Sequence, residues 1–194
     1  MISRLLSITD SKRRLTPTQV VAVSLGTLLA GYETTSNHMG TASYEVLARP
    51  GLAARLRAHP EHAEQIVEEL LRFMVVAQNG GMVHVAREDV ELADGTLIPA
   101  GALVVPVPDA ANRDAAVFTD PDEFDADRAA SPHLAFGHGL HYCVGADLAR
   151  LELRVGLQRL VAAFPDLRLA VPDTELPWRT DMLVRGLWRL PVRW

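Results

Sequence analysis

Residues 136–145 read Phe136-Gly137-His138-Gly139-Leu140-His141-Tyr142-Cys143-Val144-Gly145, and Cys143 is the only cysteine in the sequence. Three glycines surround this cysteine and remove side chains on both sides of it. Glycine lets a backbone take positive φ and approach something flat or bulky. It also leaves backbone N–H groups free to point at a sulfur, which tunes a metal–thiolate bond. The loop therefore favours a cysteine that binds a ligand through its sulfur.

Two other roles for Cys143 stay open on the residues of the loop. A catalytic nucleophile needs a nearby base, and His141 is available, but this role leaves the glycines without an explanation. A free cysteine buried in a loop would be chemically inert. A zinc site is disfavoured, because one thiolate needs further Cys or His ligands at short spacing and the chain has no Cys-x-x-Cys.

A long apolar helix is expected upstream of the loop, from Thr16 to about Ala48. Thr16 can cap its first turn, and Pro17 suits the first helical position. The segment is apolar on most of its faces, which predicts burial inside a larger body.

The run Ala30-Gly31-Tyr32-Glu33-Thr34 lies in the middle of this helix. A glycine in mid-helix costs roughly 1 kcal/mol relative to alanine, so Gly31 indicates a close neighbour or a local distortion. An acid beside a threonine at such a point can open the helical hydrogen-bond ladder and hold water. In the alternative interpretation the glycine eases helix packing and the threonine bonds back to the preceding turn. Both interpretations stay open on these residues.

Further helices are predicted from Pro50 to Ala58 and from His59 to about Phe73. Glu69 and Arg72 lie three residues apart in the second of them and share one face, where they can form an ion pair. An exposed pair of this kind contributes only a few tenths of a kcal/mol. By itself the spacing does not identify a function.

In order along the chain, these motifs resemble those of the cytochrome P-450 monooxygenases. The loop matches the family's haem-binding pattern Phe-Gly-x-Gly-x-His-x-Cys-x-Gly, and residues 30–34 match its distal-helix pattern Ala-Gly-x-Glu-Thr. Glu69 and Arg72 match its Glu-x-x-Arg, and residues 109–128 resemble the meander before the haem loop. The resemblance implies a mainly α (α+β) fold: the C-terminal half of the cytochrome P-450 fold, with long distal and proximal helices and small β-sheets.

The resemblance also implies a role for each motif residue. Cys143 would be the axial ligand of the haem iron, and Glu33 and Thr34 would deliver protons to dioxygen on the opposite face. Glu69 and Arg72 would brace the thiolate side of the haem, and a third partner would join them from a later loop. By position that partner is Arg128. The other positions implied to contact the haem are Ala30, Gly31, His84, Phe136, Gly137, Gly139, His141 and Gly145.

His84 is a departure from the family pattern. Residues 75–107 have a β-like pattern, with a strand from Ala102 to Val107 and a hairpin turn at Asp94-Gly95, and predict a small sheet. The family usually carries an arginine in this sheet that pairs with a haem propionate, and His84 takes that position. A neutral histidine can donate one hydrogen bond but has no permanent charge.

The rest of the chain continues without a repeat or a linker. A helix is predicted after Cys143 to about Phe164, where Pro165 ends it. Residues 169–171 and 190–192 predict strands of a second small sheet. We therefore interpret residues 1–194 as one truncated domain of this family.

Composition excludes several classes of protein. The formal net charge of −5 gives no basic surface for nucleic acid. The longest apolar-leaning run, Val20 to Gly31, is too short to span a bilayer. A single cysteine excludes an intrachain disulfide framework and is typical of a reducing compartment. We expect a cytoplasmic protein without nucleic-acid or membrane partners.

The function implied by the resemblance is that of a haem-thiolate monooxygenase, or a fragment of one, which inserts one oxygen atom of O2 into a small hydrophobic molecule. The cofactor would be haem b, and electrons from NAD(P)H would arrive through a ferredoxin or flavodoxin-type donor. Substrate contacts are expected from the distal helix and from residues 76–83 and 181–184.

The family's usual chain is longer, and its N-terminal half has no counterpart here. Three interpretations follow: a fragment of a monooxygenase, one half of a split enzyme, or a haem-binding remnant without turnover. A distal helix without its neighbours would expose a large apolar patch.

Overall fold

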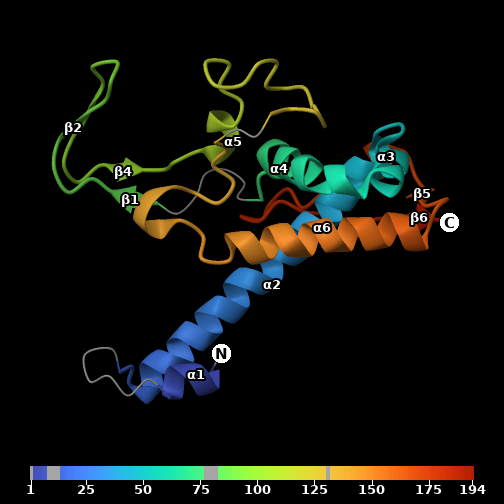
Figure 1. Cartoon of the computed structure of the whole chain (residues 1–194). Coiled ribbons are helices and arrows are strands. Elements are labelled where there is room, and N and C mark those ends of the chain that lie inside the picture. The colour runs from blue at the N-terminus through green and yellow to red at the C-terminus, as the bar shows by residue number, and fades with distance from the viewer. Residues whose placement is uncertain (1, 8–13, 77–82, 130–131) are drawn as a thin grey trace.

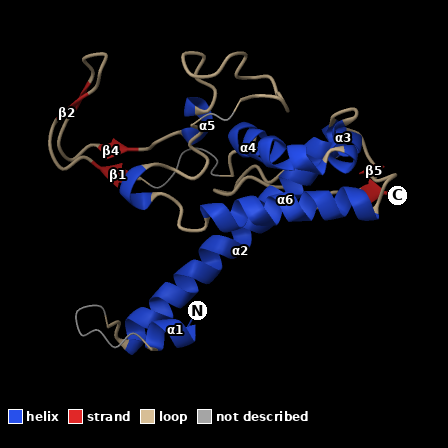
Figure 2. Cartoon of the chain, viewed as in Figure 1, coloured by secondary structure: helices blue, strands red, loops and turns tan. Residues whose placement is uncertain are grey.

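The computed structural model describes residues 2–7, 14–76, 83–129 and 132–194 (Figure 1). Two long helices cross, short helices pack around the crossing, and three two-stranded ladders lie at the periphery; Figure 2 shows how far helix outweighs strand. The helices are α1 (Ile2–Leu6), α2 (Pro17–Ala48), α3 (Leu52–Ala58), α4 (Ala63–Phe73), α5 (Pro108–Ala111) and α6 (Ala146–Ala163), with 3-10 turns η1 (Pro60–His62), η2 (Gly139–His141) and η3 (Asp173–Glu175). The strands are β1 (His84–Val85), β2 (Val90–Glu91), β3 (Leu97–Ile98), β4 (Leu103–Val104), β5 (Arg168–Leu169) and β6 (Val192–Arg193).

Helix α2 begins where the sequence predicts. Thr16 is its N-cap: the Thr16 hydroxyl accepts a hydrogen bond from the Gln19 backbone N–H, and the Gln19 side chain accepts one from the Thr16 N–H. Such a capping box satisfies two otherwise orphaned donors. The helix continues for 32 residues, about 48 Å at 1.5 Å per residue. Its end precedes Pro50, which disfavours helical backbone at Arg49.

The hydrophobic core lies between the C-terminal half of α2, α4 and α6. The buried apolar positions of α4 are Ala63, Ile66, Val67, Leu70 and Leu71, which follow the i, i+3, i+4 pattern of one helix face. Helix α2 contributes Ala42 and Val46, and α6 contributes Leu153, Leu157 and Val161. Each fully buried large aliphatic side chain stabilises the fold by about 1.5–3 kcal/mol relative to exposure.

The two long helices cross where a glycine allows close approach. A Cβ placed on Gly156 of α6 would overlap the Met39 side chain of α2. Both helices therefore have an N-terminal arm before the crossing. In Figure 1 the two arms run to the same side of the molecule and diverge from each other.

The N-terminal arm of α2, residues 17–35, is largely exposed, as Figure 1 shows. The sequence predicts burial of this helix inside a larger body, and the described residues alone leave this arm uncovered. The apolar patch predicted for a helix without its neighbours is present. The large apolar side chains exposed on the arm are Val21, Val23, Leu25, Leu28, Leu29 and Tyr32. An apolar patch of this extent marks a surface that another body covers.

The ladders are shorter than the sequence predicts. Strands β1 and β4 pair antiparallel, as do β2 and β3 on either side of the turn at Gly95, and β5 pairs with β6. Residues 102–107 form only the two-residue strand β4. The second sheet is offset from the predicted 169–171 and 190–192 to Arg168–Leu169 and Val192–Arg193, because register depends on the partner strand. Among the described residues no helix is long and apolar enough to cross a membrane.

Candidate functional site

The loop before α6 presents the thiol of Cys143 to the outside. Gly137 and Gly139 both have φ of 72°, a conformation that favours glycine. The Cys143 N–H donates to the Phe136 carbonyl at 2.9 Å, and the Tyr142 N–H donates to the Gly139 carbonyl at 3.0 Å. These bonds close the loop on itself and leave the thiol exposed.

The surroundings of the thiol are apolar and lack cover. Leu140 is 97% exposed and Val144 is fully exposed, so the loop offers hydrophobic side chains with nothing packed on them. A Cβ on Gly145 would lie 3.9 Å from Cys143 Sγ, and this glycine therefore keeps one side of the sulfur open. The loop is suited to a large apolar ligand that meets the protein at one sulfur.

The opposite arm carries Ala30, Gly31, Glu33 and Thr34, and here α2 is an unbroken helix. The Thr34 hydroxyl donates to the Ala30 carbonyl at 2.6 Å, which is the back-bonding interpretation of this motif. A Cβ on Gly31 would meet nothing within 4 Å. Of the two interpretations left open for this motif, the unbroken helix supports the second, and the space beside Gly31 is open among the described residues.

The helix crossing relates the two motifs. Gly31 lies eight residues before Met39 on α2, about 12 Å from the crossing, and Ala146 lies ten residues before Gly156 on α6, about 15 Å from it. Both motifs thus lie at similar distances along diverging arms (Figure 1).

Behind the Cys143 loop, Glu69, Arg72 and Arg128 meet in the interior. The guanidinium of Arg72 donates to both carboxylate oxygens of Glu69, at 2.7 and 2.8 Å. Arg128 Nε donates to the same carboxylate at 3.1 Å. The Arg72 and Glu69 side chains are 1% and 2% exposed, which separates this pair from the exposed kind that contributes little.

Arg72 uses all five of its N–H donors, because three further bonds run to the backbone carbonyls of Asn112, Pro121 and Glu123. The fully buried Asn112 completes the cluster. Its side-chain N–H donates to the Arg72 carbonyl, and its side-chain oxygen accepts from the Leu134 N–H at 2.7 Å. We call Glu69, Arg72, Asn112 and Arg128 the buried hub. It connects α4, the segment 109–128 and the start of the cysteine loop.

A second polar cluster holds the loop from its outer side. Arg150 of α6 donates to both carboxylate oxygens of Glu68, at 2.6 and 3.1 Å, and His133 contacts the same carboxylate at 3.1 Å. The Arg150 guanidinium also lies 4.6 Å from the centre of the Phe136 ring. Burial alone raises the pKa of Glu68, but the bonds from His133 and Arg150 more than offset it and lower the pKa to about 2.

Comparison with known proteins identifies the family of the chain. The family described as Cytochrome P450 matches residues 1–183. Nocardicin C N-oxygenase of Nocardia uniformis subsp. tsuyamanensis is 44% identical over all of this chain and 48% of its own length. Mycinamicin IV hydroxylase/epoxidase of Micromonospora griseorubida is 40% identical over all of this chain and 49% of its own. The crystal structure of the LnmA cytochrome P450 hydroxylase from Streptomyces atroolivaceus S-140 superposes with a TM-score of 0.92 at 44% identity, over all of this chain and 50% of that one.

The chain belongs to the cytochrome P450 family. Its fold is the P450 fold over about half of that structure's length, as the resemblance predicts. The chain spans about half the length of the curated relatives it matches. P450 membership implies a haem cofactor.

The residues of this P450 chain fit a haem. A metal ion held by protein alone needs three or four side-chain ligands, and the described residues contain no group of three His, Cys, Asp or Glu that could hold one. A porphyrin brings four nitrogens of its own, so one thiolate suffices. The exposed thiol of Cys143, its apolar surroundings and the open space at Gly31 match that requirement.

Two histidines of the predicted site lie at its margin. His84 is exposed in β1, with Val104 as its register partner. His141 is exposed at the end of η2, and no hydrogen bond joins its ring to Cys143 Sγ in the described structure. This geometry gives no support to a nucleophilic cysteine activated by His141. Of the predicted substrate segment 76–83, residues 77–82 lie outside the described residues.

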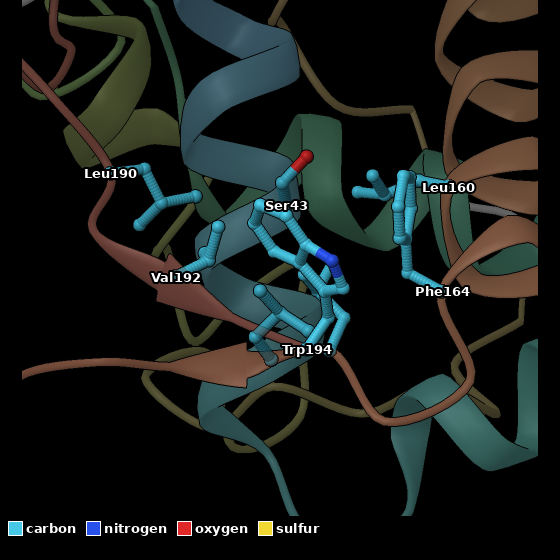
Figure 3. A pocket seen from close by; sticks show the side chains of 8 residues that line it. Ser43, Leu160, Phe164, Leu190, Val192 and Trp194 are labelled. Carbon is cyan, nitrogen blue, oxygen red and sulfur yellow. The ribbon is translucent and has the colours of Figure 1, made fainter.

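An apolar cavity of about 220 Å³ lies elsewhere, at the C-terminal ends of α2 and α6 (Figure 3). It contains none of the predicted site residues. Its lining consists of Ser43, Leu47, Leu160, Phe164, Leu167, Leu190, Val192 and Trp194. Relative to the crossing at Met39 these helix ends lie opposite the arms that carry Cys143 and Gly31, so the cavity is separate from the candidate haem site.

Sequence reasoning missed three polar partners of the site. Asn112, Arg150 and Arg179 each join segments far apart in the chain. No local pattern of the sequence marks them. Their partners become visible only in the folded chain.

Proposed function

We propose that this chain is the haem-thiolate portion of a P450 monooxygenase that inserts one oxygen atom of O2 into a small hydrophobic molecule. The observation that carries the proposal is the single exposed thiol of Cys143 in the loop that leads into α6, whose N-terminal arm diverges from the α2 arm that carries the open Gly31 segment. Haem b bound to that thiolate would supply the oxygen-activating redox chemistry. The overall reaction consumes two electrons and two protons, places one oxygen atom in a new C–O bond and releases the other as water.

The chain's own residues would have four tasks. The Cys143 sulfur binds the cofactor, and the glycines of the loop let the backbone approach it. Glu33 and Thr34 pass protons from solvent toward the dioxygen side. Ala30 and Gly31 keep that side free of bulk. The buried hub and Arg150 hold the loop in place, so that the sulfur is positioned before the cofactor arrives.

Electrons from NAD(P)H would reach the site through a ferredoxin or flavodoxin-type donor in the cytoplasm. The three proteins compared above are bacterial oxygenases and hydroxylases, which supports this proposal. Two exposed side chains of segment 181–184, Met182 and Leu183, are apolar and suit a hydrophobic substrate. His84 would offer a haem propionate one hydrogen bond in place of the usual arginine.

A second function is favoured by one observation, the exposure of the N-terminal arm of α2. Much of the wall that would enclose a substrate is not provided by the described residues. A haem-binding remnant without turnover, or one half of a split enzyme, would have this surface.

The thiolate assignment is tested on the chain produced with haem, reduced and exposed to carbon monoxide. A strongly red-shifted Soret band is expected, and Cys143→Ser should abolish it. Stoichiometric haem without the shifted band would overturn the thiolate assignment. Aggregation without haem would show that a further polypeptide is required to hold the cofactor.

The proton-delivery role is tested by Thr34→Ala in the haem-loaded protein supplied with NAD(P)H, a ferredoxin and its reductase. We expect more peroxide per oxygen consumed, because the hydroxyl that orders a proton donor is gone. Thr35→Ala is the matched control on the same helix. An unchanged peroxide yield in Thr34→Ala would mean that Thr34 does not take part in proton delivery.

A further inference from the structure

We infer that Arg179 is a positioning residue for Glu33. Through this contact Arg179 couples Glu33, on α2, to the C-terminal segment between Trp178 and Trp188. The inference rests on the proposed function, because it assigns a partner to the proposed proton donor. No motif of the sequence points to this arginine.

The contact between the two side chains is direct. Arg179 Nη2 donates to Glu33 Oε1 at 3.1 Å, across 146 residues of sequence. The arginine side chain is 12% exposed and the glutamate side chain 44%, so the pair lies at the edge of the interior rather than in free solvent. One oxygen of the carboxylate is held while the outer part of the group still reaches water. This is a suitable state for an acid that must exchange protons with solvent and also keep one orientation.

Asn37 fixes the geometry of this pair. Arg179 Nη1 donates to Asn37 Oδ1 at 2.7 Å, and the Asn37 side-chain N–H donates to the Glu33 carbonyl at 2.7 Å. Both ends of the amide are used, so the amide has one orientation and the guanidinium is bonded by two adjacent residues of one helix face. Arg179 therefore bonds two side chains that lie four residues apart on α2, and the two ends of its planar guanidinium suit this spacing.

Contacts within the C-terminal segment hold Arg179 beside Glu33 and Asn37. A Cβ on Gly186 would overlap the Asn37 side chain, so this position needs a glycine for close approach. The Arg179 N–H donates to the Gly186 carbonyl at 2.9 Å, and the Trp188 ring centre lies 4.7 Å from the Arg179 guanidinium carbon. Trp178, one residue earlier, packs edge-on against Tyr44 of α2 at 5.1 Å. We call Glu33, Asn37, Arg179 and Gly186 the clasp.

The clasp closes the base of a loop that points outward. Trp178 and Leu187 form an antiparallel bridge, and between them lie residues 181–184, the segment proposed to contact substrate. Met182 and Leu183 in that segment are exposed, whereas Arg179 and Gly186 at its base are not. A molecule that packs on the loop would therefore change the position of the Arg179 side chain, which holds Glu33. Substrate contact and proton delivery are joined through one guanidinium.

The first measurement asks whether the pair is coupled, independently of haem. Urea unfolding of the full chain is compared for wild type, Glu33→Gln, Arg179→Gln and the double variant. We expect the two single changes to be non-additive, with a coupling of about five-fold in the folded-to-unfolded ratio. A coupling below two-fold would overturn the inference. Arg189→Gln, which removes an exposed arginine from the same segment, is the control.

The second measurement separates positioning from mere support. The haem-loaded chain consumes oxygen with NAD(P)H, a ferredoxin and its reductase, and peroxide is counted per oxygen used. Arg179→Gln should raise that ratio about two- to five-fold with little added effect from Glu33→Gln, and Arg179→Lys should restore part of the loss. A purely structural arginine would change the unfolding curve and leave the peroxide ratio at the wild-type value, which would overturn the inference.

Failure of the proposed function looks different. A wild-type chain without the shifted carbon monoxide band, or without oxygen consumption, removes the proposed function and this inference with it. A wild-type chain that binds haem and consumes oxygen, while Arg179→Gln behaves like Arg189→Gln, removes this inference alone.

Discussion

The buried hub and the N-terminal arm of α2 are opposite kinds of structure within one chain. In the hub, Arg72 has every donor bonded and almost no exposed surface. On the arm, Leu28 and Leu29 are 64% and 69% exposed, and the space beside Gly31 is open. The hub is complete within the described residues, whereas the arm presents a surface without a partner in them.

The difference shows how the two sides of the candidate site are specified. The side proposed to bind haem through Cys143 is built from contacts among the described residues, which hold the loop without a ligand. The side proposed to bind dioxygen depends on α2 and on the clasp at Arg179. Changes in the hub should therefore unfold the chain, and changes on the arm should affect chemistry more than stability.

The largest effect is expected from Arg72→Ala. It leaves the buried carboxylate of Glu69 and several carbonyls without their donor, and breaking a buried ion pair in this way costs about 3–5 kcal/mol. We expect little soluble folded chain, measured by yield and far-UV circular dichroism. The matched control is Arg154→Ala, because Arg154 only approaches the exposed Glu64 at 3.9 Å. Equal stability of the two variants would contradict the role of the hub.

A smaller effect is expected from the protonation of His38 in α2, which should make the stability of the fold depend on pH. Burial lowers its pKa from 6.5 to about 4, opposed by a backbone hydrogen bond with Leu70 and assisted by the nearby His133. The unfolded chain therefore binds more protons than the folded chain between these values, and stability falls as the pH drops from 6.5 toward 4. The loss should be about 2 kcal/mol at pH near 5.

His38→Leu should remove most of this pH dependence, measured as urea midpoints at neutral pH and near pH 5. His59→Gln is the control, since His59 is exposed and pairs with the exposed Glu61. A slope that stays the same in His38→Leu would assign the acid sensitivity to another group.

Glu68→Gln is expected to have an effect of about 1 kcal/mol, reduced from a fully buried pair because Glu68 keeps contact with solvent. Its folded pKa, about 2, lies below the unfolded value of 4.5. The stabilisation is thus present above pH 4.5 and is lost as the pH falls through that range toward 2. Urea unfolding at neutral pH and near pH 3 tests this, with Glu64→Gln as the exposed control. A variant whose stability falls as steeply with acid as the wild type would exclude Glu68 as the source.

The sequence predicts interactions between residues that are close along the chain, and it does not predict those between distant segments. The start of α2 depends on Thr16, Pro17 and Gln19, which are neighbours, and it is predicted correctly. The pairing of Glu69 with Arg72 follows from helix spacing alone. The two-residue ladders and the bond from Arg179 to Glu33 depend on segments brought together by folding, and local pattern cannot supply them.

The smallest effect on stability should come from a substitution on the N-terminal arm of α2. A comparison of two leucines, one buried and one on the arm, gives the reason. Leu70 is fully buried in α4, so Leu70→Ala removes its transfer free energy and leaves a cavity, a loss of about 2–5 kcal/mol. Leu29 loses almost no buried contact when shortened, and alanine is the better helix former, so Leu29→Ala should change stability by less than about 0.5 kcal/mol. Both are measured by urea unfolding of the 194-residue chain.

A large loss in Leu29→Ala would mean that the arm is already covered in solution, by a second copy of the chain if the loss depends on protein concentration. The contrast between hub and arm would then describe one subunit of an assembly, and the Gly31 surface would have to be sought at its interface.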